Sequence, residues 1–229
     1  MAQHAKTDKI DAFVIAHFAA TAQLRALTPT STTRTALREY YQHRSHLKGL
    51  QQRLRLSSNH HHLQNTADSS QRLLDALEQE IAEMDETINQ LIKDDPELTE
   101  QAGLMATMKG IGVLTAASLL AYLPELGQVN NKEIAALAGL APYANESGQW
   151  VGTRRCRGGR KEVRTALFMA SVSATRYNPS LRAIHQRLID RGKPKKVARV
   201  ACMRKMLVWL NAMLRDGVPF SAEQAQGLV

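Results

Sequence analysis

The chain has 229 residues and a net charge of +9, with 44% apolar residues but only 5% aromatic residues. This length allows one large domain or two smaller ones, and the apolar fraction is typical of a folded protein. There is no run of eighteen apolar residues and no opening signal peptide, which argues against a membrane protein and favours a cytoplasmic location. The two cysteines, Cys156 and Cys202, give neither a disulfide framework nor a metal-ligand spacing.

The charges are unevenly distributed along the chain. Residues 150–215 carry 17 Lys and Arg residues against 2 acids, whereas residues 68–100 carry 11 acids against 2 basic residues. Long alternating runs of β-branched residues are absent, which favours helices over a sandwich or barrel. The sequence therefore predicts a mostly α-helical protein whose C-terminal half is suited to bind a polyanion.

A first helix is expected over residues 5–26. Asp8 and Asp11 are three residues apart, so both carboxylates would lie on one face of this helix. Such a pair can share a divalent metal, but acids in a first turn also complement the helix dipole. The residues alone favour the second interpretation.

Residues 30–100 predict an antiparallel coiled-coil arm of two helices, because apolar residues recur at steps of three and four. The first helix is basic and the second acidic, which favours their pairing within a hairpin or across a dimer. We interpret the histidines from His60 to His62, between the helices, as part of a solvated loop. The expected facing residues are Ala36, Tyr40, His43, Leu47, Leu50 and Leu54 in the first helix and Leu74, Leu77, Ile81, Met84, Ile88 and Leu91 in the second.

The stretch from 103 to 126 matches a helix-hairpin-helix pattern, in which two short helices flank a glycine-hydrophobic-glycine bend. Gly110 and Gly112 would let the backbone approach a DNA phosphate without reading sequence, with Lys109 beside them. The alternative is a helical hairpin whose glycines serve packing only.

Ser147 lies in a stretch that Pro142, Asn145 and Gly148 mark as a loop. A cluster of cations follows it, able to hold phosphate oxygens two at a time: Arg154, Arg155, Arg157, Arg160, Lys161 and Arg164. Most serines in such turns close a bend or cap a helix, and no His or Asp stands at a triad spacing. A small extended hairpin is expected over residues 149–156.

Three basic helices are expected after this cluster. Asn178 and Pro179 stand in the order of a helix cap and first turn, and Gly217 with Pro219 ends the last helix. Lys195 and Lys196 begin that helix and add to the expected DNA-binding surface.

Four blocks, found in order along the chain, resemble the DEDD-type bacterial insertion-sequence transposases, which have a RuvC-like front domain, a coiled coil and a C-terminal serine domain. The blocks are KTDKIDA (6–12), GIGVLTAASLLAYLPELG (110–127), the stretch around APYANESGQW (141–150) and the RYNPSLRAIHQRL…GKPKKVARVACMRKMLVWLNAMLRDG ending. The resemblance divides the chain into a front-domain remnant (1–29), the arm (30–100), a helix-hairpin-helix and serine-bearing domain (101–219) and a tail (220–229).

The resemblance implies a recombinase that moves a DNA element with an RNA guide and self-associates through its coiled coil. Ser147 matches the serine that attacks DNA, and Asp8 and Asp11 match two of four acidic metal ligands. A divalent metal, Mg²⁺, is expected for the complete family protein. Only seven residues precede Asp8, so we expect an N-terminally truncated chain that does not hold the metal alone.

Two other functions compete with a transposase component. One is a non-catalytic DNA or junction binder that modulates a full-length transposase. The other is a coiled-coil interaction protein with an incidental basic surface.

Overall fold

The computed structural model describes residues 8–21, 31–58, 63–143, 146–147, 150–152 and 155–221, with the backbone alone at 146, 147, 150 and 151. The described chain is mostly α-helical, which confirms the predicted fold class. It divides into two compact units between Thr30 and Ser31. No helix in these ranges is long and apolar enough to span a bilayer.

The first unit contains α1 (Asp8–Thr21). None of its residues is buried, and Phe13, Val14, Ile15 and Phe18 are each more than half exposed. The apolar side chains of α1 are therefore uncovered within the described part of this unit.

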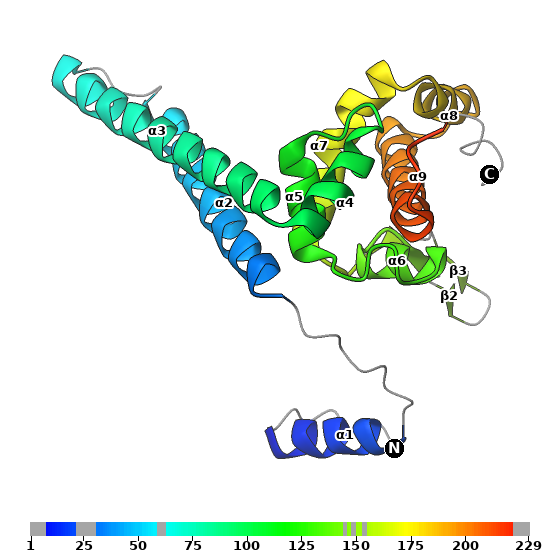
Figure 1. Ribbon diagram of the computed structural model, residues 1–229. Helices are drawn as coiled ribbons and strands as arrows, with labels where there is room; N and C mark the ends of the chain where they lie inside the picture. Colours follow the sequence, from blue (N-terminus) through cyan, green and yellow to red (C-terminus); the bar gives the residue numbers. More distant parts are fainter. Residues whose placement is uncertain are drawn as a thin grey trace. The chain divides into compact units, whose positions relative to one another are not determined.

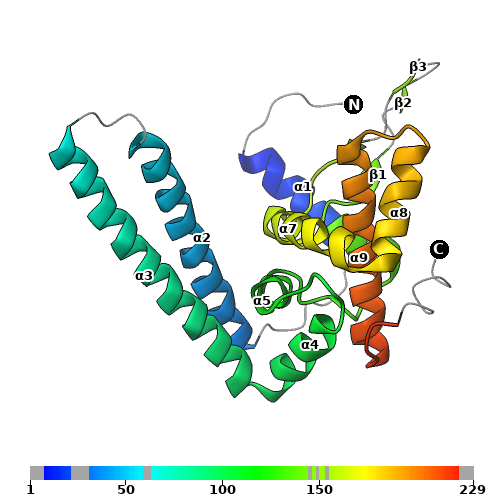
Figure 2. The ribbon, with the colours of Figure 1, turned by 90° about the horizontal axis from the view of Figure 1, so that it is seen from above.

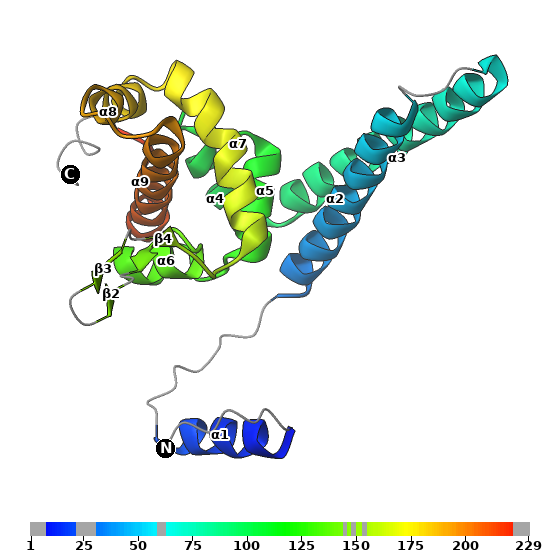
Figure 3. The same ribbon diagram turned by 180° about the vertical axis from the view of Figure 1, so that it is seen from behind.

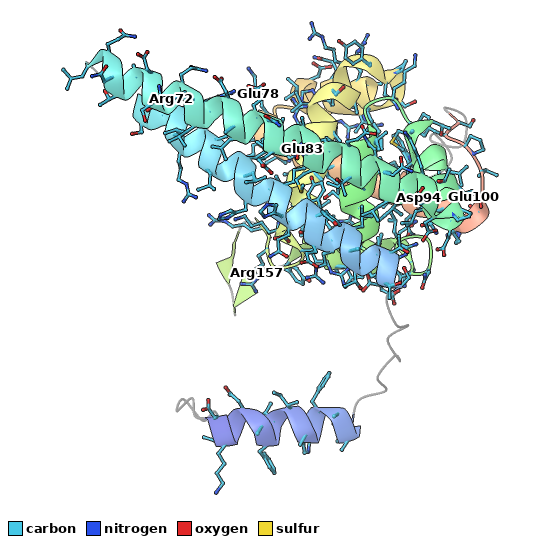
Figure 4. The ribbon with its side chains drawn as sticks, turned by 60° about the vertical axis from the view of Figure 1, so that its left-hand side comes forward. Arg72, Glu78, Glu83, Asp94, Glu100 and Arg157 are labelled. Atoms are coloured by element: carbon cyan, nitrogen blue, oxygen red, sulfur yellow. The ribbon has the colours of Figure 1, made fainter. Side chains whose placement is uncertain are left out.

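In the second unit, α2 (Thr32–Ser58) and α3 (Gln64–Asp94) form a long antiparallel pair (Figure 1). The face predicted for α3 is the covered one, since Ile81 and Ile88 are buried. The Arg44 guanidinium forms a two-pronged ion pair with the Asp85 carboxylate across the pair. On the other side of α3, Glu78 and Glu83 point to solvent (Figure 4).

The predicted face of α2 is partly wrong. Tyr40 and Leu50 are each 37% exposed, whereas Leu37 and Gln51 are buried. The covered face of α2 is therefore shifted by about one residue from the predicted one. At its start α2 also packs on α5, and Tyr41 meets Tyr122 edge-on at 5.9 Å between ring centroids.

The remaining elements form a helical body with a short ribbon of strands (Figures 1 and 2). The elements are α4 (Pro96–Ala106), α5 (Val113–Tyr122), α6 (Asn131–Leu137), β1 (Pro142–Tyr143), β2 (Glu146–Ser147), β3 (Trp150–Val151), β4 (Arg155–Cys156), α7 (Lys161–Tyr177), α8 (Pro179–Asp190) and α9 (Lys195–Asp216). Two helices form its centre. Every residue of α5 from Ala116 to Tyr122 is buried, and α9 buries eleven residues against α4, α6, α7 and α8.

Local capping explains where several helices begin and end. The Asp95 carboxylate accepts from the Glu97 and Leu98 amides and starts α4, and the Asn178 side chain starts α8 in the same way. Gly217 ends α9 at φ 65°, a left-handed conformation that favours glycine. The predictions made from Asn178, Pro179 and Gly217 are confirmed.

A buried side-chain amide connects α9 with the loop before α6. The Asn211 side chain in α9 accepts from the Gly127 amide and donates to the Val129 carbonyl, each at 2.8 Å. The loop before α6 is thereby held on α9, and α6 leads directly into the strands.

Candidate functional site

Ser147 lies in a strand, which corrects the expected loop. Glu146 pairs with Val151 and Ser147 with Trp150, while Pro142 and Tyr143 pair with Cys156 and Arg155. The described strands therefore lie between residues 142 and 156, a wider range than the predicted 149–156; we call this stretch the ribbon. It projects from the helical body beside α6 (Figures 1 and 3).

The two chain ends of the ribbon meet in close backbone contact. Gly139, after α6, and Gly159, before α7, both have positive φ, at 66° and 64°. A side chain on either glycine would collide with the other segment. The Arg160 amide then donates to the Leu137 carbonyl at 2.9 Å. We call this meeting of residues 137–141 and 156–160 the ribbon root.

Arg160 is part of this root, although the sequence predicted a DNA contact for it. Its guanidinium binds both oxygens of the Glu125 carboxylate, at 2.5 and 2.6 Å, and the Tyr122 carbonyl at 3.0 Å. Tyr122 ends α5, so the positive charge also lies at the negative end of a helix dipole. The hydrogen bond with Glu125 raises the pKa of Arg160 above its usual value, so it stays charged.

Arg164 also has partners within the chain. Its guanidinium donates to the Gly158 carbonyl and to the Ala138 carbonyl, the latter at 3.4 Å. Ala138 follows α6, and Gly158 belongs to the segment that returns from the ribbon. Arg164 thus bonds to both sides of the root.

Other predicted cations are exposed. Arg155 lies in β4, Arg157 follows it with its guanidinium 5.9 Å from the centre of the Tyr143 ring, and Lys161 begins α7. Figure 4 shows Arg157 close to the strands. Arg154 lies outside the described residues. On the body, Lys109 is exposed before α5, as are Lys195 and Lys196 at the start of α9.

The two glycines of the predicted helix-hairpin-helix differ in their surroundings. Gly110 has φ 105°, and a side chain there would collide with the backbone and Cβ of Ala174 in α7. Gly110 therefore serves packing, as in the alternative considered for this bend. Gly112 is the N-cap of α5 at φ −100° and has open space around its Cα. Of the two, only Gly112 has room for a side chain.

Asp8 and Asp11 lie in the first turn of α1, in the N-terminal unit. Their carboxylates are the kind of donor that Mg²⁺ prefers. Within the described residues no three or more His, Cys, Asp or Glu side chains gather into a metal-binding group. The pair therefore has the chemistry of divalent-metal ligands but does not belong to such a group within the described residues.

The sequence did not single out Glu125 or Arg199. Arg199 in α9 donates to the Ser171 carbonyl at 2.9 Å and to the Thr175 hydroxyl at 2.7 Å, both in α7. Glu125 is 35 residues from Arg160. No sequence spacing connects Glu125 with Arg160, or Arg199 with its partners in α7, so the sequence pattern gave no signal for these contacts.

Two protein-family models match the chain. Residues 102–186 match the family described as "Transposase IS116/IS110/IS902 family", and residues 1–66 match a DEDD-type IS110 family described as "Transposase". The pilin gene-inverting protein of Moraxella bovis is 33% identical over 222 residues, which cover 94% of this chain and 68% of that protein. The chain belongs to the IS116/IS110/IS902 transposase family.

Other proteins are also similar to the chain. The pilin gene-inverting protein of Moraxella lacunata shows the same identity and coverage. An uncharacterized 43.6 kDa protein of insertion element IS110 from Streptomyces coelicolor is 29% identical over 157 residues, which cover 68% of this chain and 38% of that protein. Asp8 and Asp11 fall in the first family match and Ser147 with the cations from 154 to 164 in the second, while Lys195 and Lys196 lie outside both.

Proposed function

We propose that this transposase-family chain is the DNA-recombining component of an insertion sequence and that it cuts and rejoins DNA through Ser147. The observation that carries the proposal is the match along 94% of the chain to proteins named for inverting a pilin gene. Inversion of a gene requires DNA strands to be cut and rejoined. Ser147 is a hydroxyl in the matched region, on a ribbon that projects from the body.

The proposed chemistry is an exchange of phosphate esters. The Ser147 oxygen forms a bond to phosphorus as the bond from phosphorus to one deoxyribose oxygen breaks. That oxygen leaves as a hydroxyl and takes a proton in place of the one lost by Ser147. Because one ester replaces another, the energy of the cut bond is kept for rejoining. Exposed Arg155, in β4, and Arg157, directly after β4, would complement the phosphate charge.

Asp8 and Asp11 are the residues that would hold a divalent metal. Such an ion supplies charge neutralisation to the phosphate when it is bound. The family match over residues 1–66 supports this role for the pair.

We also propose three partners from the family resemblance. The first is DNA, held by the basic surface of α7 to α9. The second is a guide RNA, and the third is a second copy of the chain, paired through the arm. The basic α2 and the acidic α3 give the arm flanks of opposite charge, which supports self-association.

Substitution of the serine tests the reaction. The chain is incubated with duplexes taken from the DNA on either side of its coding sequence, RNA transcribed from the same DNA, and Mg²⁺. We expect a covalent protein–DNA adduct on a denaturing gel, and Ser147→Ala should abolish it while binding in a gel shift survives. The control is Ser173→Ala, which removes an exposed hydroxyl from α7. An adduct that persists in Ser147→Ala rejects the assignment.

A second candidate function is a non-catalytic DNA or junction binder that modulates a full-length transposase. It is favoured by the two carboxylates at Asp8 and Asp11, which form only part of the family's ligand set. In the same experiment this function predicts specific binding by the unchanged protein and no adduct.

A further inference from the structure

We propose that Arg160, through Glu125, and Arg164 are positioning residues that fix the ribbon root, and that neither is a phosphate ligand. The inference rests on the proposed function, because it concerns where the segment that carries Ser147 is held. It also gives a role to Glu125, whose negative charge would disfavour DNA binding.

Arg160 connects three segments that are distant in sequence. Its backbone amide bonds to Leu137 at the end of α6. Its guanidinium bonds to Tyr122 at the end of α5 and to Glu125 in the following turn. The start of α7 is therefore tied to two helix ends by one residue. Since α7 follows the ribbon directly, the position of Arg160 sets where the ribbon returns to the body.

Arg164, one turn later, closes the other side of the root. It bonds to carbonyls on both segments that enter and leave the ribbon, at Ala138 and Gly158. Gly139 and Gly159 permit this arrangement because their backbones are in contact. Arg160 and Arg164, at the start of α7, thus hold both ends of the ribbon that contains Ser147.

The contacts of Arg160 within the chain leave few of its N–H donors for a DNA phosphate. Both terminal nitrogens of its guanidinium are used by Glu125, and the side chain is only 33% exposed. A phosphate that bound the same two nitrogens in a two-pronged way would have to displace the Glu125 carboxylate. Reaction rates are far more sensitive than affinity to small displacements, and a shift of about 1 Å can cost about 100-fold.

The decisive variant is Glu125→Gln, because the two roles predict opposite effects. If Arg160 positions the root, Glu125→Gln and Arg160→Gln each slow single-turnover adduct formation by about 10- to 100-fold at saturating DNA. The Kd for DNA stays within about twofold, and the double variant is no slower than the slower single one. If Arg160 is a phosphate ligand, Glu125→Gln frees it, so the rate is kept and binding tightens. That result overturns the proposal.

Arg164→Gln should behave like Arg160→Gln, with slower adduct formation and unchanged affinity. A phosphate contact at Arg164 would instead weaken binding and lower the salt dependence of log K by about 0.9. The control is Glu133→Gln, an acid whose carboxylate accepts from the Asn130 amide in a capping box at the start of α6, the opposite end of that helix from the root. Its adduct rate should match that of the unchanged protein.

Amide hydrogen exchange keeps this inference separate from the Ser147 assignment. In Glu125→Gln, peptides covering 137–143 and 155–161 should exchange about 10-fold or more faster, while a peptide from the centre of α9 is unchanged. Unchanged exchange at the root rejects the positioning role, whatever the adduct assay shows. An adduct that survives Ser147→Ala rejects only the serine, and the exchange result then stands by itself. Arg160→Lys, which keeps the positive charge but loses the planar two-pronged geometry, provides a milder variant if Arg160→Gln fails to fold.

Discussion

Burial separates the two cysteines of this chain. Cys202 in α9 is fully buried, with its thiol 3.9 Å from the Leu181 carbonyl, whereas Cys156 in β4 is exposed. Burial penalises the thiolate and raises the pKa of Cys202 to about 11. Since the thiolate is the reactive form, about one molecule in a thousand is reactive at this position at pH 8.

We therefore expect selective alkylation in the native protein. Iodoacetamide at pH 8 should modify Cys156 within minutes and leave Cys202 intact, as measured by mass spectrometry of the peptides. Cys156→Ser should then take up no label until urea is added. Equal labelling of both cysteines without denaturant would show that Cys202 is not enclosed as described.

At this scale the sequence reveals residue types but not their partners. The sequence predicted that the cations from 154 to 164 form one DNA-binding cluster, but in the structure some are exposed and others bond within the chain. Arg155, Arg157 and Lys161 are exposed, while Arg160 bonds to Glu125 and Arg164 to two carbonyls. The division arises from tertiary contacts that no local spacing encodes.

At the scale of elements, the bend before α5 combines two different glycines. Ala at 110 would require a left-handed backbone and a collision with Ala174, whereas Ala at 112 meets open space at an ordinary φ. We expect Gly110→Ala to lower the free energy of unfolding by about 2–5 kcal/mol. Gly112→Ala should cost about 1 kcal/mol or less, because only an N-cap preference is lost. Urea denaturation followed by circular dichroism measures both.

The same pair tests the helix-hairpin-helix hypothesis. If the bend contacts a DNA phosphate, Gly112→Ala should weaken DNA binding in a folded protein, because the added methyl group occupies the approach. Unchanged affinity would remove the bend from the DNA-binding surface. A small stability loss in Gly110→Ala would contradict its packing against α7.

Elements with strong local signals were predicted well. The heptad pattern identified the covered face of α3, and Asn178 with Pro179 identified the start of α8. The covered face of α2 was misplaced by about one residue, and its packing on α5 as well as on α3 is a tertiary contact that the heptad pattern does not encode. The strand at Ser147 was missed because strands of two residues carry no periodicity.

Across the whole molecule, positive and negative charges occupy different parts of the chain. Residues 150–215 carry 17 basic residues against 2 acids, and the excess of acids lies in residues 68–100. Such a concentration of like charge opposes folding through self-repulsion, and a bound polyanion would relieve that repulsion. A protein that neutralises phosphates releases counterions, so its affinity for DNA falls with salt, and the slope of log K against log salt counts the contacts.

We expect Lys195→Gln with Lys196→Gln to lower this slope by about 2, because both side chains are exposed at the start of α9. Fluorescence anisotropy with a labelled 30-base-pair duplex between 50 and 300 mM NaCl measures it. The matched control is Arg215→Gln, at the other end of α9, whose guanidinium pairs with the Asp216 carboxylate at 2.8 and 2.9 Å. That variant removes one positive charge from the same helix, against two in the double variant, and should leave the slope unchanged. Equal slopes in all three proteins would show that the start of α9 does not contact DNA, and a flat dependence in the unchanged chain would reject DNA binding by its basic half.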